Sequence, residues 1–130
     1  MHPIALIGTS ILGLLLFGLG LNVSRLRGKF HVGAGYPDDQ THPLHRAVRA
    51  HGNTAEFAPF FAVLLLYLGS CAQPMWVLVV MALAVLSRVL QVVGMLSCKT
   101  LARPSPLRFA GSLGTYVTGI VLSAVLLLGL

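Results

Sequence analysis

Long apolar segments alternate with short polar ones along the whole chain. Four segments are long and apolar enough to form membrane-spanning helices, at about residues 3–23, 44–69, 74–96 and 106–128. A bilayer core about 30 Å thick requires about 20 helical residues. Lipid offers no partner to unpaired backbone groups, so isolated spans of this length are helices. The pattern therefore predicts an all-α fold, a four-helix transmembrane bundle that forms a single domain over residues 1–130.

The composition supports a membrane protein and argues against nucleic-acid binding. Hydrophobic residues make up 56% of the chain and charged residues 9%, whereas soluble domains carry about 25% charged residues. The net charge is +6, but the basic residues adjoin the apolar segments, where Lys and Arg set topology and meet lipid phosphates. No nucleic-acid recognition module is visible.

The basic residues are concentrated in two of the three connections. Residues 24–43 and 97–105 hold most of the Lys and Arg, whereas both termini and residues 70–73 hold none. The positive-inside rule then places the two basic connections in the cytoplasm and both termini outside. Cys71 and Cys98 would lie on opposite sides of the membrane, which argues against a disulfide between them.

The second segment begins with a polar cluster, RAVRAHGNTAEF, at residues 46–57. Arg49, Asn53 and Glu56 are spaced i, i+4 and i+7, so a helix places them on one stripe. Buried ionisable groups in membranes commonly mark functional sites. The residues alone leave two interpretations open: hydrogen bonds and salt bridges between helices, or a ligand site.

Two further arginines lie in the third and fourth segments. Arg88 is in the middle of the third segment, where a lone cation requires a partner. Glu56 is the only carboxylate in the four segments, so we expect a buried structural ion pair between them, with direct ligand contact by Arg88 as the alternative. Arg108 opens the fourth segment, and Ser112, Thr115 and Tyr116 follow it as a polar flank. In a purely structural interpretation Arg108 is an interfacial anchor and the hydroxyls bond back to the helix.

Several kinds of chemistry lack the residues they need. The chain contains no GxSxG, HExxH or P-loop motif, and its only carboxylates are Asp38, Asp39 and Glu56. The histidines nearest one another, His42, His45 and His51, have no supporting carboxylate pattern, so no metal site is predicted.

The stretch RAHGNTAEF, residues 49–57, resembles the signature of the MAPEG family, membrane-associated proteins in eicosanoid and glutathione metabolism. That signature has an Arg, an Asn four residues later and a Glu three residues further on. The resemblance extends to SRLRGKF at residues 24–30, to Arg88 and to Pro-Leu-Arg at residues 106–108, and so covers essentially the whole chain. It is most similar to the bacterial YecN-like branch.

The resemblance implies a homotrimer of four-helix protomers, here in a bacterial inner membrane. Glutathione, the co-substrate, would bind between neighbouring protomers near the cytoplasmic side. Arg108 would be the catalytic residue that stabilises the glutathione thiolate, since an adjacent cation activates a thiol. Glu56 would accept from the glutathione amino group, and arginines would hold its two carboxylates. The positions that match glutathione contacts are Arg25, Arg49, Asn53 and Glu56, with Arg27 as a weaker match.

This chain departs from the eicosanoid-forming members in the third and fourth segments. Those members hold glutathione with tyrosines where this chain has Met95 and Ser112, and Gln91 stands where some members have His. Gly52 replaces an Arg of some members, and Tyr116 is available one turn beyond Ser112 as a substitute.

Three function hypotheses follow. The first is a glutathione transferase, with peroxidase activity as a further option, acting on lipophilic electrophiles or lipid hydroperoxides in the membrane. The second is a non-catalytic binding or structural membrane protein of the same fold. The third is a small channel or transporter, for which the chain has neither paired half-helices nor a repeat.

Overall fold

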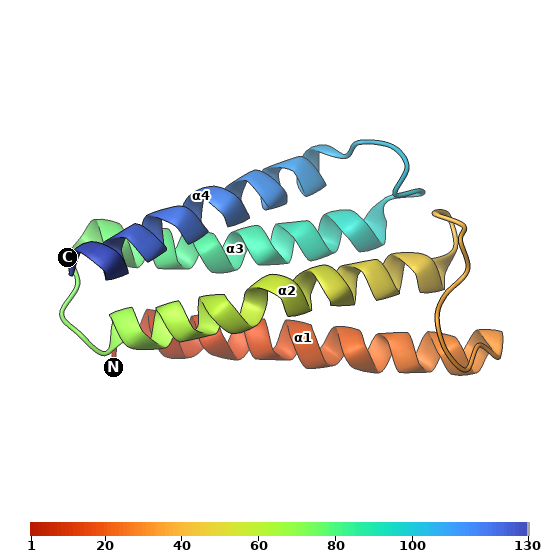
Figure 1. Cartoon of the computed structure of the whole chain (residues 1–130), viewed down its shortest axis with the longest axis horizontal. Helices are drawn as coiled ribbons and strands as arrows, with labels where there is room; N and C mark the ends of the chain where they lie inside the picture. Colours follow the sequence, from red (N-terminus) through yellow and green to blue (C-terminus); the bar gives the residue numbers. More distant parts are fainter. Residues whose placement is uncertain (130) are drawn as a thin grey trace.

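The computed structural model describes residues 1–129 of the chain. This part of the chain is all-helical, with α1 at Pro3–Phe30, α2 at Pro43–Gly69, α3 at Met75–Ser97 and α4 at Pro106–Leu128 (Figure 1). All four helices are long and apolar enough to cross a membrane. The predicted all-α fold with four spanning helices is therefore confirmed, and it points to an integral membrane protein.

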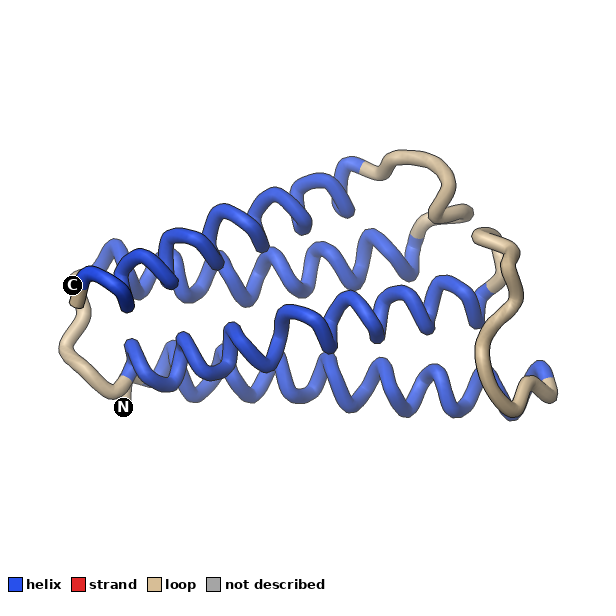
Figure 2. The backbone as a smooth tube through the Cα atoms, in the orientation of Figure 1, coloured by secondary structure: helices blue, strands red, loops and turns tan. Residues whose placement is uncertain are grey.

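The helices run alternately up and down, so the loops gather at two ends (Figure 2). The α1–α2 and α3–α4 connections lie together at one end, called here the basic end, where the backbone N–H of Leu101 donates to the carbonyl of Gln40 at 3.2 Å. At the other end the N–H of His2 donates to the carbonyl of Gly69 at 2.7 Å. Cys71 and Cys98 are free, and they lie at opposite ends of the bundle because α3 separates them.

Helix α1 continues to Phe30, well past the predicted end near residue 23. The extra turns form because Val23 and Leu26 are buried against the start of α2, in a cluster with Leu44 and Ala47. A helix of 28 residues spans about 42 Å at about 1.5 Å per residue, so the basic last turns extend beyond a bilayer core. His31 ends α1 in the left-handed conformation, with φ of 56°.

Histidine and proline define the starts of the first two helices. His2 and His42 are N-cap residues, and their Nδ1 atoms accept from the backbone N–H groups of Ile4 and Leu44 at 3.3 and 3.1 Å. Proline follows each cap at the first helical position, where its missing N–H costs nothing. The caps therefore satisfy backbone donors that the first turn leaves unpaired.

Two helix pairs form the bundle. Helix α1 packs along α2 and α3 along α4, and a common core joins the pairs through buried residues such as Leu12, Phe61, Met81 and Leu122. In the described residues α1 contacts α2 and α3, but it makes no contact with α4. Of the helix pairs that do touch, α2 and α4 contact each other least. The side of the bundle between them is therefore the most open one between touching helices, and these two helices frame the site described below.

Glycines bring α3 and α4 into close contact. A Cβ atom at Gly111 would lie 2.5 Å from the backbone nitrogen of Gln91, and one at Gly94 would lie 2.8 Å from the backbone nitrogen of Arg108. A Cβ atom at Gly114 would collide with the hydroxyl of Ser87. Small residues allow this approach between membrane helices, so the position of α4 against α3 depends on them.

We expect Gly111→Ala to destabilise the bundle, because its methyl group would meet the α3 backbone, which cannot move aside as a flexible side chain can. Overpacking of this kind costs about 1–3 kcal/mol. Thermal unfolding in detergent measures the effect. Gly28→Ala is the matched control, because a Cβ atom at Gly28 has no neighbour within 4 Å. Equal melting temperatures for Gly111→Ala and the wild type would contradict the close contact.

Candidate functional site

One face of α2 carries the polar stripe predicted from the sequence. Arg49 and Glu56 are exposed on this face, and Asn53 between them is half-buried. The same face continues into the aromatic residues Phe57 and Phe60. On this one face of α2, charged and amide side chains are therefore followed directly by an apolar surface.

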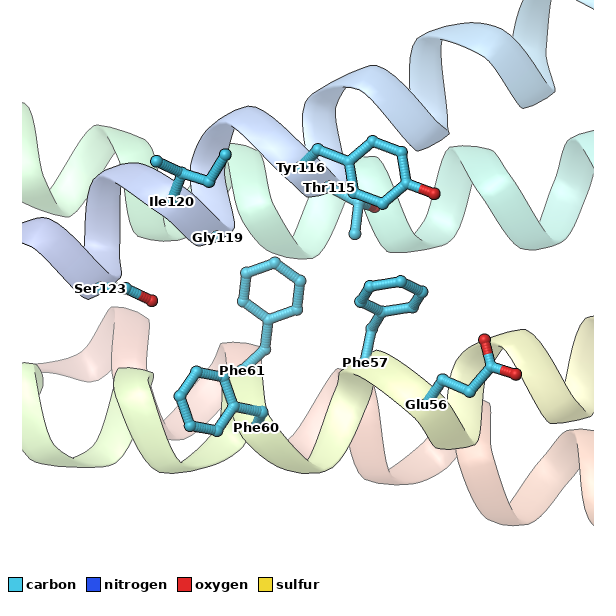
Figure 3. A pocket seen from close by; sticks show the side chains of 9 residues that line it. All are labelled: Glu56, Phe57, Phe60, Phe61, Thr115, Tyr116, Gly119, Ile120 and Ser123. Atoms are coloured by element: carbon cyan, nitrogen blue, oxygen red, sulfur yellow. The ribbon is translucent and has the colours of Figure 1, made fainter.

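This surface forms one wall of a pocket between α2 and α4, called here the α2/α4 pocket. It has a volume of about 590 Å³. In Figure 3, Glu56 lies at one end of the pocket and Ser123 at the other, with aromatic rings between them. The rings of Phe57 and Tyr116 face each other across it, with centroids 5.9 Å apart at an interplanar angle of 64°. The lining residues are Glu56, Phe57, Phe60, Phe61, Thr115, Tyr116, Gly119, Ile120 and Ser123.

Arg88 lies behind this pocket, in the middle of the bundle, and is only 1% exposed. One terminal nitrogen donates to the side-chain oxygen of Asn53 at 2.7 Å and to its backbone carbonyl at 3.1 Å. The other donates to the hydroxyl of Thr115 at 3.1 Å. Its guanidinium carbon lies 5.1 Å from the centroid of the Phe57 ring, within range of a cation–π interaction. Arg88 thus connects α3 to both α2 and α4.

The expected ion pair between Arg88 and Glu56 is not formed in the described chain, where the oxygen partners of Arg88 are Asn53 and Thr115. Glu56 is exposed at the edge of the α2/α4 pocket (Figure 3). The physical reason is that Asn53 offers two acceptor oxygens beside the guanidinium without requiring a second charge to be desolvated.

Arg108 is half-buried at the start of α4. One of its terminal nitrogens donates to the carbonyls of Leu101 and Arg103, at 3.1 and 3.0 Å. Its side chain is therefore held at the basic end by the α3–α4 connection. One turn further along α4, the hydroxyl of Ser112 donates to the side-chain oxygen of Gln91 at 3.1 Å.

Arg25 and Arg27 lie on α1, apart from the α2/α4 pocket. Arg25 is exposed and donates to the side-chain oxygen of Asn22 at 2.9 Å, and Arg27 donates to the carbonyl of Gly35 at 3.3 Å. Because α1 does not contact α4 within residues 1–129, a single chain does not bring Arg25 to Arg108. The structure thus joins Asn53 to Arg88 and places Glu56 in the pocket, but it leaves the α1 arginines separate.

The three neighbouring histidines have separate surroundings. His42 caps α2, the Nδ1 atom of His45 lies 2.8 Å from the carbonyl of Pro37, and His51 packs against Gly20. Across residues 1–129, no group of three or more His, Cys, Asp or Glu side chains is arranged to hold a metal ion.

The sequence reasoning did not identify most of the pocket lining. Phe57, Phe60 and Phe61 lie at i, i+3 and i+4, and Tyr116, Ile120 and Ser123 lie at i, i+4 and i+7. Each spacing places the residues on one helix face, and this periodicity is the sequence signal that could have identified them. The periodicity does not indicate which helix faces meet, because every spanning helix is apolar on several sides.

Comparison with known proteins gives one match. A model of the MAPEG family matches residues 5–128. Neither the curated proteins nor the solved structures yield a match.

Arg46 should stabilise the basic end independently of any ligand. Its guanidinium donates to the carbonyls of Leu96 and Cys98, which α3 leaves unpaired at its C-terminus. Hydrogen bonds to charged groups contribute about 1.5–3 kcal/mol, so Arg46→Ala should lower the melting temperature in detergent. Arg49→Ala is the control, because Arg49 is exposed on the same helix. A larger loss in the control would contradict this role of Arg46.

Proposed function

This chain belongs to the MAPEG family, and from that premise we propose that it is a membrane-bound glutathione transferase that conjugates glutathione to lipophilic electrophiles. MAPEG proteins use glutathione, and the family includes glutathione transferases and peroxidases. The observation that carries the proposal is the direct succession, on one face of α2, of a polar stripe and an aromatic pocket. A polar thiol peptide and an apolar acceptor would meet at that boundary.

The polar stripe suits the chemistry of glutathione, which has two carboxylates, an amino group and a thiol. Arg49 is exposed, and its guanidinium would bind a carboxylate through two parallel hydrogen bonds. Glu56 is exposed three residues beyond Asn53 and would accept from the amino group. Neither charge has to break an ion pair within the described chain to do so.

Arg108 would hold the sulfur of glutathione as a thiolate. A neighbouring cation lowers a thiol pKa from about 8.5 towards neutrality. One terminal nitrogen of Arg108 is occupied by two carbonyls, and its Nε atom is enclosed, so the second terminal nitrogen remains for the ligand. The thiol proton would pass to water. The thiolate would then form a bond to the electrophilic carbon, and the leaving group would depart with the electron pair of the broken bond.

The α2/α4 pocket would receive the acceptor. Phe60 and Ile120, on opposite walls of the pocket, are 60% and 70% exposed, so the pocket is open at the surface that would face lipid. An apolar molecule dissolved in the bilayer could enter sideways without crossing water. The aromatic lining favours flat, apolar acceptors through ring stacking.

A homotrimer would complete the site. Arg25 and Arg27 match glutathione-contacting positions of the family, but they lie on α1, which does not contact α4 in the described chain. A neighbouring protomer would supply them, as a closed ring of identical chains allows.

We further propose that the protein lies in a bacterial inner membrane with its basic end in the cytoplasm, on the positive-inside rule. The YecN-like branch stays a prediction.

Removal of Arg108 should remove most of the thiolate at neutral pH. Wild-type protein in detergent should give a thiolate absorbance with glutathione near pH 7, and a conjugate with an aryl halide. In Arg108→Ala the bound thiol should return to its ordinary pKa of about 8.5, which leaves a few per cent thiolate at pH 7. Lys99→Ala is the matched control, because this exposed cation lies in the α3–α4 connection that precedes Arg108. Glu56→Ala should weaken glutathione binding.

The same assay tests the alternative of a non-catalytic MAPEG protein. That alternative is favoured by the hydrogen bond between Ser112 and Gln91, since these side chains are paired with each other on the wall where other members hold glutathione. Glutathione binding by calorimetry without thiolate absorbance or conjugate would support it. Absence of any glutathione binding would overturn the transferase proposal.

Mixed oligomers test the shared site. Arg25→Ala and Arg108→Ala chains should each be inactive alone. After co-expression, random assembly of a trimer should restore about a quarter of the sites, because one variant supplies Arg25 and the other Arg108 across an interface. Conjugation by the purified mixture measures this recovery. A monomer by native mass spectrometry, or no recovery in mixed trimers, would contradict the intersubunit site.

A further inference from the structure

The contact between Arg88 and Asn53 fixes more than the packing of α2 against α3. A guanidinium has five N–H donors and no acceptor. The Asn53 atom that lies 2.7 Å from the Arg88 nitrogen must therefore be the oxygen of the amide. The backbone carbonyl of Asn53 accepts from the same Arg88 nitrogen at 3.1 Å. Both oxygens of Asn53 therefore accept hydrogen bonds from one nitrogen of Arg88. This arrangement excludes the flipped amide.

The amide nitrogen of Asn53 is then directed away from Arg88. Within residues 1–129 this nitrogen has no hydrogen-bond partner, and it is not among the enclosed unpaired atoms, so it lies at the accessible surface of a half-buried residue. Asn53 shares its helix face with Arg49 and Glu56. An unpaired amide at this depth of a membrane protein is costly, and a polar ligand or water would satisfy it.

The rest of the Arg88 contacts hold the guanidinium in place. Thr115 accepts from its second terminal nitrogen while its own hydroxyl proton goes to the carbonyl of Gly111 at 2.7 Å. The Phe57 ring lies against the guanidinium. Arg88 is almost fully buried, so a ligand in the α2/α4 pocket does not touch it directly.

We propose that Arg88 is a positioning residue that locks Asn53 as a hydrogen-bond donor to the ligand. The inference rests on the proposed function and sharpens its specificity. Along α2 the stripe then offers a donor at Arg49, a donor at Asn53 and an acceptor at Glu56. Successive groups lie about 6 and 4.5 Å apart along the axis at about 1.5 Å per residue. The ligand must present two acceptors, such as carboxylate or carbonyl oxygens, followed by an amino group.

The first experiment compares Arg88→Lys with Arg88→Gln by calorimetry of glutathione binding in detergent. Lysine is also a donor without an acceptor and keeps Asn53 in its orientation, whereas glutamine has a carbonyl that lets the Asn53 amide turn inwards. We expect Arg88→Lys to bind glutathione about tenfold more tightly than Arg88→Gln, the effect of one hydrogen bond to a charged group. Affinities that follow the melting temperatures of the two variants, with no advantage for lysine, would overturn the proposal.

Asn53→Asp separates positioning from stability. Its carboxylate can still accept from Arg88, and this pairing should keep the melting temperature at or above that of the wild type. The donor to the ligand is lost, so glutathione affinity should fall about tenfold or more. Binding is measured at low and high salt. A loss of affinity that is caused by the missing donor should remain at high salt, whereas a loss caused by repulsion between exposed charges should be screened. Wild-type affinity at high salt would contradict a donor role for Asn53.

A readout without glutathione keeps this inference distinct from the proposed function. The chain has two asparagines, Asn22 and Asn53, so labelling with ¹⁵N-asparagine gives two side-chain amide groups in NMR spectra, and Asn53→Asp assigns them. In the free wild-type protein both Asn53 amide protons should exchange with solvent, and in Arg88→Gln one should become protected. A protected proton in the wild type would overturn the proposal, whereas absent glutathione binding alone would overturn only the transferase.

Discussion

One buried cation ties together three of the four helices. Arg88 extends from α3 to Asn53 on α2 and Thr115 on α4, and it lies over the Phe57 ring that lines the α2/α4 pocket. A charge at this depth is tolerated only with polar partners. The distance between α2 and α4 is consequently set by the hydrogen bonds of the guanidinium to Asn53 and Thr115. The pocket begins beyond these hydrogen bonds.

The pairing of helices explains why polar and apolar chemistry meet at this place. Glycines allow α4 to pack closely against α3, whereas α4 makes few contacts with α2. The gap between them carries aromatic residues from both helices (Figure 3). Because α2 begins with polar residues and ends with apolar ones, any ligand in this gap has a charged neighbour on one side and a hydrocarbon-like neighbour on the other.

The departures from the eicosanoid-forming members have a structural counterpart. Gln91 and Ser112 hydrogen-bond to each other, and Met95 is buried against Leu19 and Ala50 in the core. These side chains therefore contribute to packing between helices. In the proposed glutathione site the donors would come instead from α2 and from Arg108, and the orientation of the Asn53 amide would then determine specificity.

The sequence by itself determined the helices and the polar stripe. Four apolar segments bounded by proline, glycine and charge leave few other folds in lipid, and helical periodicity places Arg49, Asn53 and Glu56 on one face. Tertiary structure alone decided the partner of Arg88, the extension of α1 and the walls of the pocket. Each depends on which faces meet, and in uniformly apolar helices steric contact at small residues such as Gly111 decides that.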